Sequence, residues 1–208
     1  MTLNLEKIKA LNYDHHRRMG EIHAANIANG KANPSAEADD QSYRSLLKNV
    51  PRDQSLVLEL GSASGGQWKT LSEWGKELVG IDLYEPFVTE ARKHGLPIYL
   101  GFVEDMAAIF PANHFDMVCS RHVMEHLGDV DRGIGEIKRI LRPGGWSCHV
   151  TPDMPYDDEP AHLNKWKMWE WSAKWAEHGF QIISVEKREF NGGEVHVTAL
   201  APGSSLPR

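Results

Sequence analysis

Apolar residues along this chain fall into short continuous runs and into runs with helical spacing. The continuous runs at 56–60, 78–82 and 115–119 lack polar alternation, which is typical of strands buried on both faces of a sheet. Val130, Ile134, Ile137 and Leu141 recur at the spacing of one helix face, and Asp129 is placed to cap that helix. The pattern therefore predicts strands that alternate with helices.

The remaining segments extend this alternation to the end of the chain. Arg142-Pro143-Gly144-Gly145 is expected to end the helix before the next strand, because proline cannot continue a helix. Asn191-Gly192-Gly193 predicts a tight turn, so the last two strands should pair antiparallel. We expect these further strands and helices: strands at 97–100, 146–150, 182–190 and 194–200, and helices at 38–47, 67–75, 85–94 and 165–178.

These elements predict an α/β sandwich built on a mainly parallel seven-stranded sheet with one antiparallel strand. We place this domain at 51–201, after a helical N-terminal extension or lid at 1–50 and before a flexible tail at 202–208. In the extension, the cluster His15-His16-Arg17-Arg18 is either a lid that contacts a ligand carboxylate or a solvated helix face.

The stretch 55–66, S-L-V-L-E-L-G-S-A-S-G-G, organises the rest of the chain. A buried strand leads into a turn of small residues, and Trp68, Leu71 and Trp74 then begin a helix. This order is typical of a nucleotide site in an open parallel sheet, although an ordinary turn of small residues is the alternative. Glu59 inside the apolar run favours a site, because a buried carboxylate needs a partner. Asp82 ends the next strand and could accept two ribose hydroxyls.

Composition narrows the functional classes. The chain has 208 residues, 41% of them hydrophobic, and a net charge of −6, which argues against general nucleic-acid binding. We expect no membrane span and no secretory signal, since no apolar run reaches roughly 20 residues and the N-terminus lacks a signal core. Cys119 and Cys148 lie in separate predicted strands, which favours reduced thiols and a cytoplasmic protein.

Five motifs follow one another in this chain: L-E-L-G-S-A-S-G, G-I-D-L, G-F-V-E-D-M, F-D-M-V-C-S-R-H-V-M-E-H-L and L-R-P-G-G-W. In this order they resemble the class I S-adenosylmethionine-dependent methyltransferases, especially the branch that acts on quinone precursors and other small molecules. The resemblance covers about 56–200. It implies a Rossmann-like three-layer fold, S-adenosylmethionine as cofactor and a small-molecule acceptor.

The resemblance also implies which residues contact the cofactor. Glu59 would orient the glycine turn, Asp82 would hold the ribose, and residues 120–122 would line the methyl-transfer site. The full set of implied cofactor-binding residues is Glu59, Gly61, Ser62, Ala63, Gly65, Asp82, Leu83, Val103 and Glu104. Two positions depart from the family pattern: Ala63 stands where glycine is usual, and Phe102 where aspartate is common.

Methyl transfer from a sulfonium needs alignment above all, and a base only if the acceptor arrives protonated. His122 and His126 are the candidate catalytic residues, because they follow the fourth strand and titrate near neutral pH. Alternatively, Glu125 and His126 orient the loop. A metal site is also conceivable from His122, Glu125, His126, Asp153, Glu159 and His162. We expect no metal, because the order H-E-x-x-H is missing.

The tryptophans of the late helix offer one further candidate contact. We expect Trp169 and Trp175 in the core and Trp166 near a substrate. The rival functions are a S-adenosylmethionine-binding protein without catalysis and a nicotinamide-dependent oxidoreductase. The second rival would explain Asp82 but not Glu59. A nucleic-acid methyltransferase fits less well, because C-S-R-H follows the fourth strand in place of N/D-P-P-Y.

Overall fold

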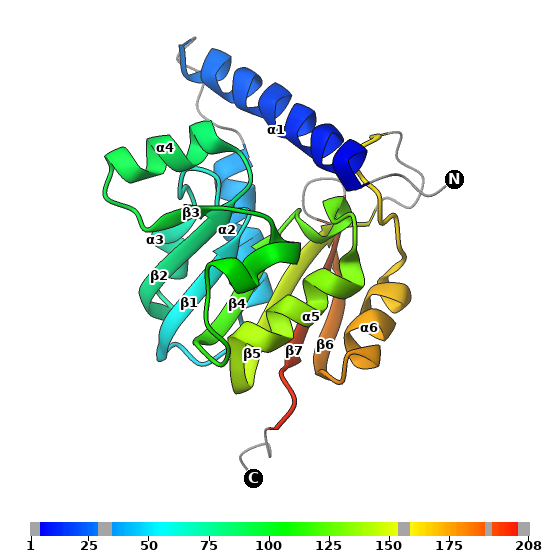
Figure 1. Cartoon of the computed structure of the whole chain (residues 1–208). Coiled ribbons are helices and arrows are strands. Elements are labelled where there is room, and N and C mark those ends of the chain that lie inside the picture. The colour runs from blue at the N-terminus through cyan, green and yellow to red at the C-terminus, as the bar shows by residue number, and fades with distance from the viewer. Residues whose placement is uncertain (1–4, 29–34, 154–158, 190–192, 204–208) are drawn as a thin grey trace.

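The computed structural model describes residues 5–28, 35–153, 159–189 and 193–203. Its centre is a seven-stranded sheet in the order β3-β2-β1-β4-β5-β7-β6 (Figure 1). All neighbouring strands pair parallel except β7, which is antiparallel to both β5 and β6. The predicted sheet with one antiparallel strand is confirmed. The strands are β1 Gln54–Leu60, β2 Gly75–Asp82, β3 Ile98–Leu100, β4 Phe115–Arg121, β5 Leu141–Pro152, β6 Gln181–Arg188 and β7 Glu194–Leu200.

Helices cover both faces of the sheet, which gives the predicted three layers. On one face, Val57 and Met117 pack against α2 and α3; on the other, Leu58 and Val118 face α5 and α6. This split follows from the strand period of two, which sends successive side chains to opposite faces. The helices are α1 Leu5–Ala28, α2 Ser35–Leu46, α3 Trp68–Leu71, α4 Glu85–Lys93, α5 Val130–Ile140 and α6 Met168–Glu177, with short 3₁₀ turns at η1 Val103–Ala108 and η2 Met124–His126.

The two N-terminal helices occupy different places. Helix α2 packs on the sheet, where Tyr43, Leu46 and Leu47 are buried in the core. Helix α1 instead lies across the carboxyl ends of the strands (Figure 1). It therefore covers the edge at which parallel sheets bind ligands.

Helix α5 forms as predicted. The Asp129 carboxylate accepts a hydrogen bond of 3.0 Å from the backbone amide of Arg132, and Ile134 and Ile137 are buried on one face. The next strand, however, begins at Leu141 and not at 146, because Leu141 pairs directly with Phe115. The register shift between Phe115 and Met117 accommodates the residues of the R-P-G-G stretch within the strand.

Two further expectations were wrong. The helix after the glycine turn spans only Trp68–Leu71, because the chain enters β2 at Gly75. A side chain at Gly75 would collide with Val57, since its Cβ would lie 2.5 Å from Val57 Cγ2.

Trp169, which was expected in the core, is 62% exposed. Trp171 and Trp175 are one helical turn apart and take the inner face of α6, so Trp169 points away from it.

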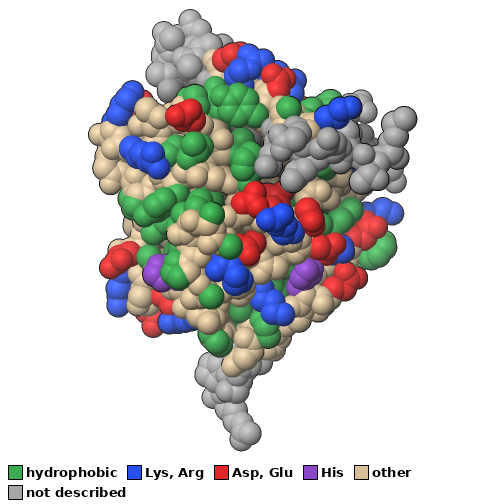
Figure 2. Space-filling view, viewed as in Figure 1, with side chains coloured by type: hydrophobic (Ala, Val, Ile, Leu, Met, Phe, Trp, Pro, Cys, Tyr) green, Lys and Arg blue, Asp and Glu red, His purple; other side chains and the backbone are tan. Residues whose placement is uncertain are grey.

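The surface and the predicted termini add little to this picture. Acidic and basic side chains are interspersed over the face in Figure 2. No helix in the described part of the chain combines the length and apolar character that a membrane crossing requires. Cys119 and Cys148 are buried and free. The predicted turn at 191–192 and most of the predicted tail lie outside the described residues.

Candidate active site

The loops that follow β1, β2 and β4 form two hollows that meet at Gly61. Strand β1 lies between β2 and β4, so the connections diverge there, as at the ligand sites of open α/β sheets. The large hollow has a volume of about 280 Å³ and is lined by Met19, Asp39, Tyr43, Glu59, Gly61, Ser62, Ala63, Ser64, Gly66, Gln67, Phe87 and Arg121. The small hollow has about 40 Å³ and is lined by Asn12, Gly61, Ile81, Asp82, Leu83, Gly101, Phe102, Val103, Glu104, Val123 and His126.

The turn after β1 has a backbone that only small residues tolerate. Gly61 has φ +64°, and a Cβ on it would lie 2.4 Å from Val123 Cγ2. Ala63 also has positive φ, at 45°, so the position where glycine is usual keeps the left-handed conformation. Gly65 packs against Leu96 and is absent from the lining of both hollows, whereas Gly66 lines the large one. The turn therefore brings backbone to the large hollow through residues 61–64 and 66.

Glu59 anchors this turn to the helices that flank it. Its carboxylate accepts hydrogen bonds from Tyr43 Oη, at 2.7 Å, and from Trp68 Nε1, at 3.0 Å. The side chain is 3% exposed. Burial raises the pKa of Glu59 to about 7, although both hydrogen bonds oppose the rise. Tyr43 is the partner that sequence reasoning missed, since it lies on α2, before the strand.

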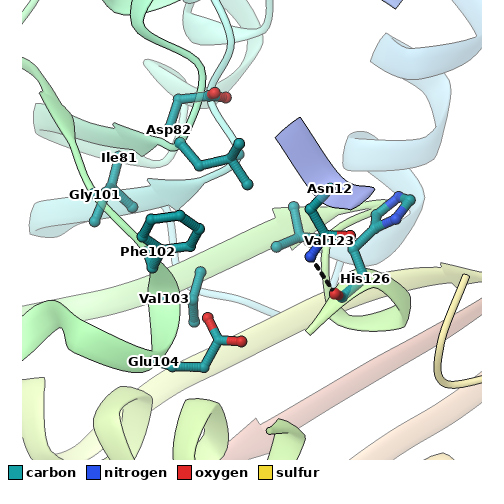
Figure 3. Close-up of a pocket in the computed structure, with 11 residues that line it drawn as sticks. Asn12, Ile81, Asp82, Gly101, Phe102, Val103, Glu104, Val123 and His126 are labelled. Atoms are coloured by element: carbon teal, nitrogen blue, oxygen red, sulfur yellow. Dashed lines mark hydrogen bonds between the residues drawn. The ribbon is translucent and has the colours of Figure 1, made fainter. Parts of the chain in front are cut away.

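Asp82, at the end of β2, lines the small hollow and contacts a residue that lines the large one. Its Oδ2 accepts a hydrogen bond from the amide of Ala63 at 2.9 Å, and its Oδ1 accepts one from the amide of Tyr84 at 2.8 Å. Burial raises the pKa of Asp82 to about 6. Figure 3 shows Asp82, Phe102, Val103 and Glu104 on the wall of the small hollow. Leu83 lines it as well.

Helix α1 forms the opposite wall of the small hollow. Asn12 Nδ2 donates a buried hydrogen bond of 2.7 Å to the carbonyl oxygen of His126 (Figure 3). The ring of Tyr13 packs edge-on against Tyr84, with 5.4 Å between centroids. Sequence reasoning gave the helix but not these contacts. Of the basic cluster, Arg17 pairs with Asp14 and Glu21 of its own helix.

A charge network with a buried carboxylate forms part of the wall of the large hollow. Arg121 bridges Asp39 on α2, at 2.7 Å, and Glu194 at the start of β7, at 2.9 Å. Burial would raise the pKa of Glu194, but hydrogen bonds from its neighbours and the charge of Arg121 together hold it well below its usual range. Those hydrogen-bonding neighbours are His122, His196 and Ser42.

His122 adjoins this network in a strained conformation. It has φ +53°, which is uncommon outside glycine. Its Nε2 lies 3.2 Å from Glu194 Oε1, and its Nδ1 lies 3.7 Å from Glu125 Oε1. Burial lowers the pKa of His122. His122 is not itself among the residues that line the two hollows, whereas its neighbour Arg121 lines the large one.

The other residues considered as metal ligands separate into two places. Glu125, His126 and His162 come together, with their ligand atoms within 4.8 Å of one another. His126 Nδ1 lies 2.9 Å from the carbonyl oxygen of Ala161. Asp153, in contrast, pairs with Lys187 at 2.6 Å. Trp166 packs against Trp171, with 4.7 Å between ring centroids.

Comparison with known proteins agrees with this geometry. The profile of a family described as "Methyltransferase domain" matches residues 58–148. The protein named "Uncharacterized methyltransferase YcgJ" of Bacillus subtilis is 23% identical over 173 residues, which cover 73% of this chain and 67% of YcgJ. The crystal structure of YcgJ matches this fold with a TM-score of 0.63 and 17% identity, covering 77% of this chain and 97% of that one.

A second relative has a more specific name. The ubiquinone biosynthesis O-methyltransferase of Thiobacillus denitrificans is 28% identical over 129 residues. The match covers 59% of this chain and 55% of the relative, so the chain spans about half of that enzyme's length. Residues 58–148 carry a methyltransferase domain.

The residues of the site fit S-adenosylmethionine, the cofactor that a methyltransferase domain of this fold implies. Gly61 keeps backbone open at the junction of the hollows, where any side chain would collide with Val123. Ser62 Oγ is buried and has no hydrogen-bond partner among the described residues, so a bound ligand can supply the missing hydrogen bond. The buried Asp82 carboxylate offers acceptors to hydroxyl groups. The donor set therefore suits a molecule with ribose hydroxyls and a polar tail.

Proposed function

We propose that this methyltransferase transfers a methyl group from S-adenosylmethionine to a hydroxyl group of a small molecule by in-line displacement. The observation that carries the proposal is the large hollow, which joins the Glu59–Ala63 turn to Arg121, the residue before His122. The O-methyltransferase among the relatives supports a hydroxyl acceptor.

The cofactor supplies an electrophilic methyl group when it is bound, and the chain provides the cradle. We assign the turn residues Glu59, Gly61, Ser62 and Ala63 to its amino-acid portion, since they line the large hollow. Asp82 is assigned to the ribose hydroxyls. Residues 83, 103 and 104 are assigned to the base, because they line the small hollow. Gly65 receives no cofactor contact, because it packs against Leu96.

His122 is the proposed general base. A hydroxyl acceptor must lose its proton, and a neutral imidazole can take it. Glu194, 3.2 Å from His122 Nε2, would orient the ring and stabilise the imidazolium that forms, as the carboxylate of a catalytic triad does. For His126 we propose an orienting role, because its carbonyl oxygen and Nδ1 both hold neighbouring segments in place.

Ligand-dependent thermal unfolding tests the cofactor. A ligand at about 100 times its dissociation constant stabilises the native state by roughly 2.7 kcal/mol. We expect S-adenosylmethionine and S-adenosylhomocysteine to raise Tm and NAD to leave it unchanged. A shift with NAD alone would overturn the proposal in favour of an oxidoreductase.

Turnover tests the reaction and its base. We expect methylated product by mass spectrometry when the protein and S-adenosylmethionine are incubated with a panel of small phenols and other hydroxyl compounds. His122→Asn should lower kcat by about 100-fold or more, in the range of general base catalysis, with the cofactor affinity retained. His114→Asn is the matched control, because His114 is exposed at the opposite end of β4. Cofactor binding without turnover on any acceptor would favour the non-catalytic rival.

A further inference from the structure

Three imidazoles and a buried carboxylate converge beside the small hollow. His126 lies with its ring centroid 4.9 Å from that of His15 and 4.8 Å from that of His162. Glu125 is buried, and its Oε1 is 3.9 Å from His126 Nε2. These four residues come from three separate segments: α1, the loop after β4 and the loop before α6. Segments so far apart in sequence do not gather histidines by local periodicity.

We propose that Glu125, His126 and His162 form a binding site for one divalent transition metal ion of the zinc type, with the neighbouring His15 drawn in as the fourth ligand. Imidazole nitrogens with one carboxylate oxygen are a ligand set that zinc prefers, whereas magnesium and calcium prefer oxygen ligands alone. With His15 drawn in, four protein ligands would make a closed, structural site. The proposal concerns metal binding and does not depend on methyl transfer.

The ligand atoms can reach such an ion after the side chains move inward. In a tetrahedral site, ligand bonds of roughly 2.0–2.2 Å put two donor atoms about 3.4 Å apart. The ligand atoms of Glu125, His126 and His162 already lie within 4.8 Å of one another. The three side chains therefore have to close by up to about 1.4 Å to reach tetrahedral separation. His15 lies outside this group of three, with its ring centroid 6.3 Å from that of His162, and has to move inward as well.

Outer partners hold two of the histidines in the orientation that a metal requires. His126 Nδ1 lies 2.9 Å from the carbonyl oxygen of Ala161, a contact that requires the proton on Nδ1 and leaves the lone pair on Nε2. His15 Nδ1 is 3.4 Å from Glu159 Oε1. Metal-binding histidines commonly donate the other ring N–H to a carbonyl or a carboxylate in this way.

The backbone fixes the two loops against each other. The amides of Leu163 and Asn164 both donate to the carbonyl oxygen of Glu125, at 2.8 and 3.0 Å. The Asn164 side chain donates to the carbonyl oxygen of Leu127 at 2.8 Å. Only His15 belongs to an element outside these loops. Metal binding would therefore join α1, the helix over the cofactor hollow, to the body of the protein.

The first experiment is a metal titration of the full chain without a histidine tag, after treatment with a chelator. We expect one equivalent of Zn²⁺ per chain by equilibrium dialysis, a rise in Tm, and a visible spectrum typical of tetrahedral Co²⁺ when Co²⁺ replaces it. His162→Gln should weaken Zn²⁺ binding at least roughly tenfold. His94→Gln is the control, because His94 is an exposed histidine that also lies near a glutamate, Glu90.

His126→Gln should weaken Zn²⁺ binding to the same extent. If His126→Gln fails to fold because His126 is buried, the result for His162→Gln alone tests the site. Binding by His162→Gln equal to that of the wild type would overturn the site, as would binding of several weak equivalents.

Trypsin tests the link to α1, since Arg17 and Arg18 are exposed on that helix. Zn²⁺ should slow cleavage at these two arginines at least roughly tenfold in the wild type, and this protection should be lost in His15→Gln. Equal cleavage with and without Zn²⁺ would overturn the participation of His15.

Discussion

Replacing Glu59 by glutamine should change how stability depends on pH. Glutamine has the same shape and can keep both contacts, with Oε1 accepting from Trp68 Nε1 and Nε2 donating to the Tyr43 oxygen. What the variant loses is the ionisable group. The comparison therefore isolates the ionisation of a carboxyl that is 3% exposed.

The direction follows from the raised pKa. The pKa of Glu59 is about 7 in the folded protein and 4.5 in the unfolded chain. The native state thus holds a proton that the unfolded state releases, so the contribution to stability is full below about pH 4.5 and is lost as the pH rises through about 7. Integrated from pH 5 to pH 8, the loss amounts to about 2.5 kcal/mol.

Urea unfolding of both proteins at pH 5, 6, 7 and 8 measures this loss directly. Groups that titrate independently of Glu59 cancel in the difference. Asp82 belongs to the measured effect, because its charge helps to raise the pKa of Glu59. Relative to the wild type, Glu59→Gln should gain about 2.5 kcal/mol in the free energy of unfolding between pH 5 and pH 8. A difference that stays constant over this range would show that Glu59 ionises as it does in water, and the role of burial would be refuted.

Three further predictions concern the turn, the ribose site and a helix end. Gly61→Ala should destabilise the fold by about 1–3 kcal/mol, and adding Val123→Ala in the same chain should restore part of that loss. Gly66→Ala is the control, because a Cβ on Gly66 meets nothing within 4 Å. Equal losses of stability in Gly61→Ala and Gly66→Ala would contradict the steric argument. Asp82→Ala should weaken S-adenosylmethionine binding at least tenfold by calorimetry, roughly one hydrogen bond to a charged group, and unchanged affinity in a folded variant would remove that role. Asp129→Ala should lower the free energy of unfolding by about 1 kcal/mol in urea melts, and no change would show that the cap contributes nothing.

The strands and the glycine turn could be predicted because their signals are local. Continuous apolar runs give buried strands, and the strand carrying Glu59 leads directly into the small residues that follow it. Errors occurred where a distant part of the chain decided the outcome. Trp169, Trp171 and Trp175 all lie on α6. Only the position of the sheet decides which face of that helix is buried. Strand β5 begins early because Phe115 offers a pairing partner.

The candidate site was less predictable for the same reason. Asn12 and His126 are 114 positions apart, and no periodicity of α1 specifies where that helix lies on the sheet edge. Glu194, at the start of the last strand, reaches the site only because β7 inserts between β5 and β6. His162 was considered as a ligand from its residue type, but its closeness to Glu125 depends on the loop before α6.

Buried carboxylates of the sheet have different partners, and the difference indicates which of them have ionised forms that the protein alone stabilises poorly. At the amino end, Asp116 accepts amide hydrogen bonds from Ser55 and Leu56 and pairs with Arg142. At the carboxyl end, Glu194 pairs with Arg121, whereas Glu59 and Asp82 have raised pKa values despite their hydrogen bonds. Their ionised forms are therefore costly in the protein alone. A ligand that brings a cation or hydroxyl donors would lower that cost, so binding energy and fold stability are linked at this edge.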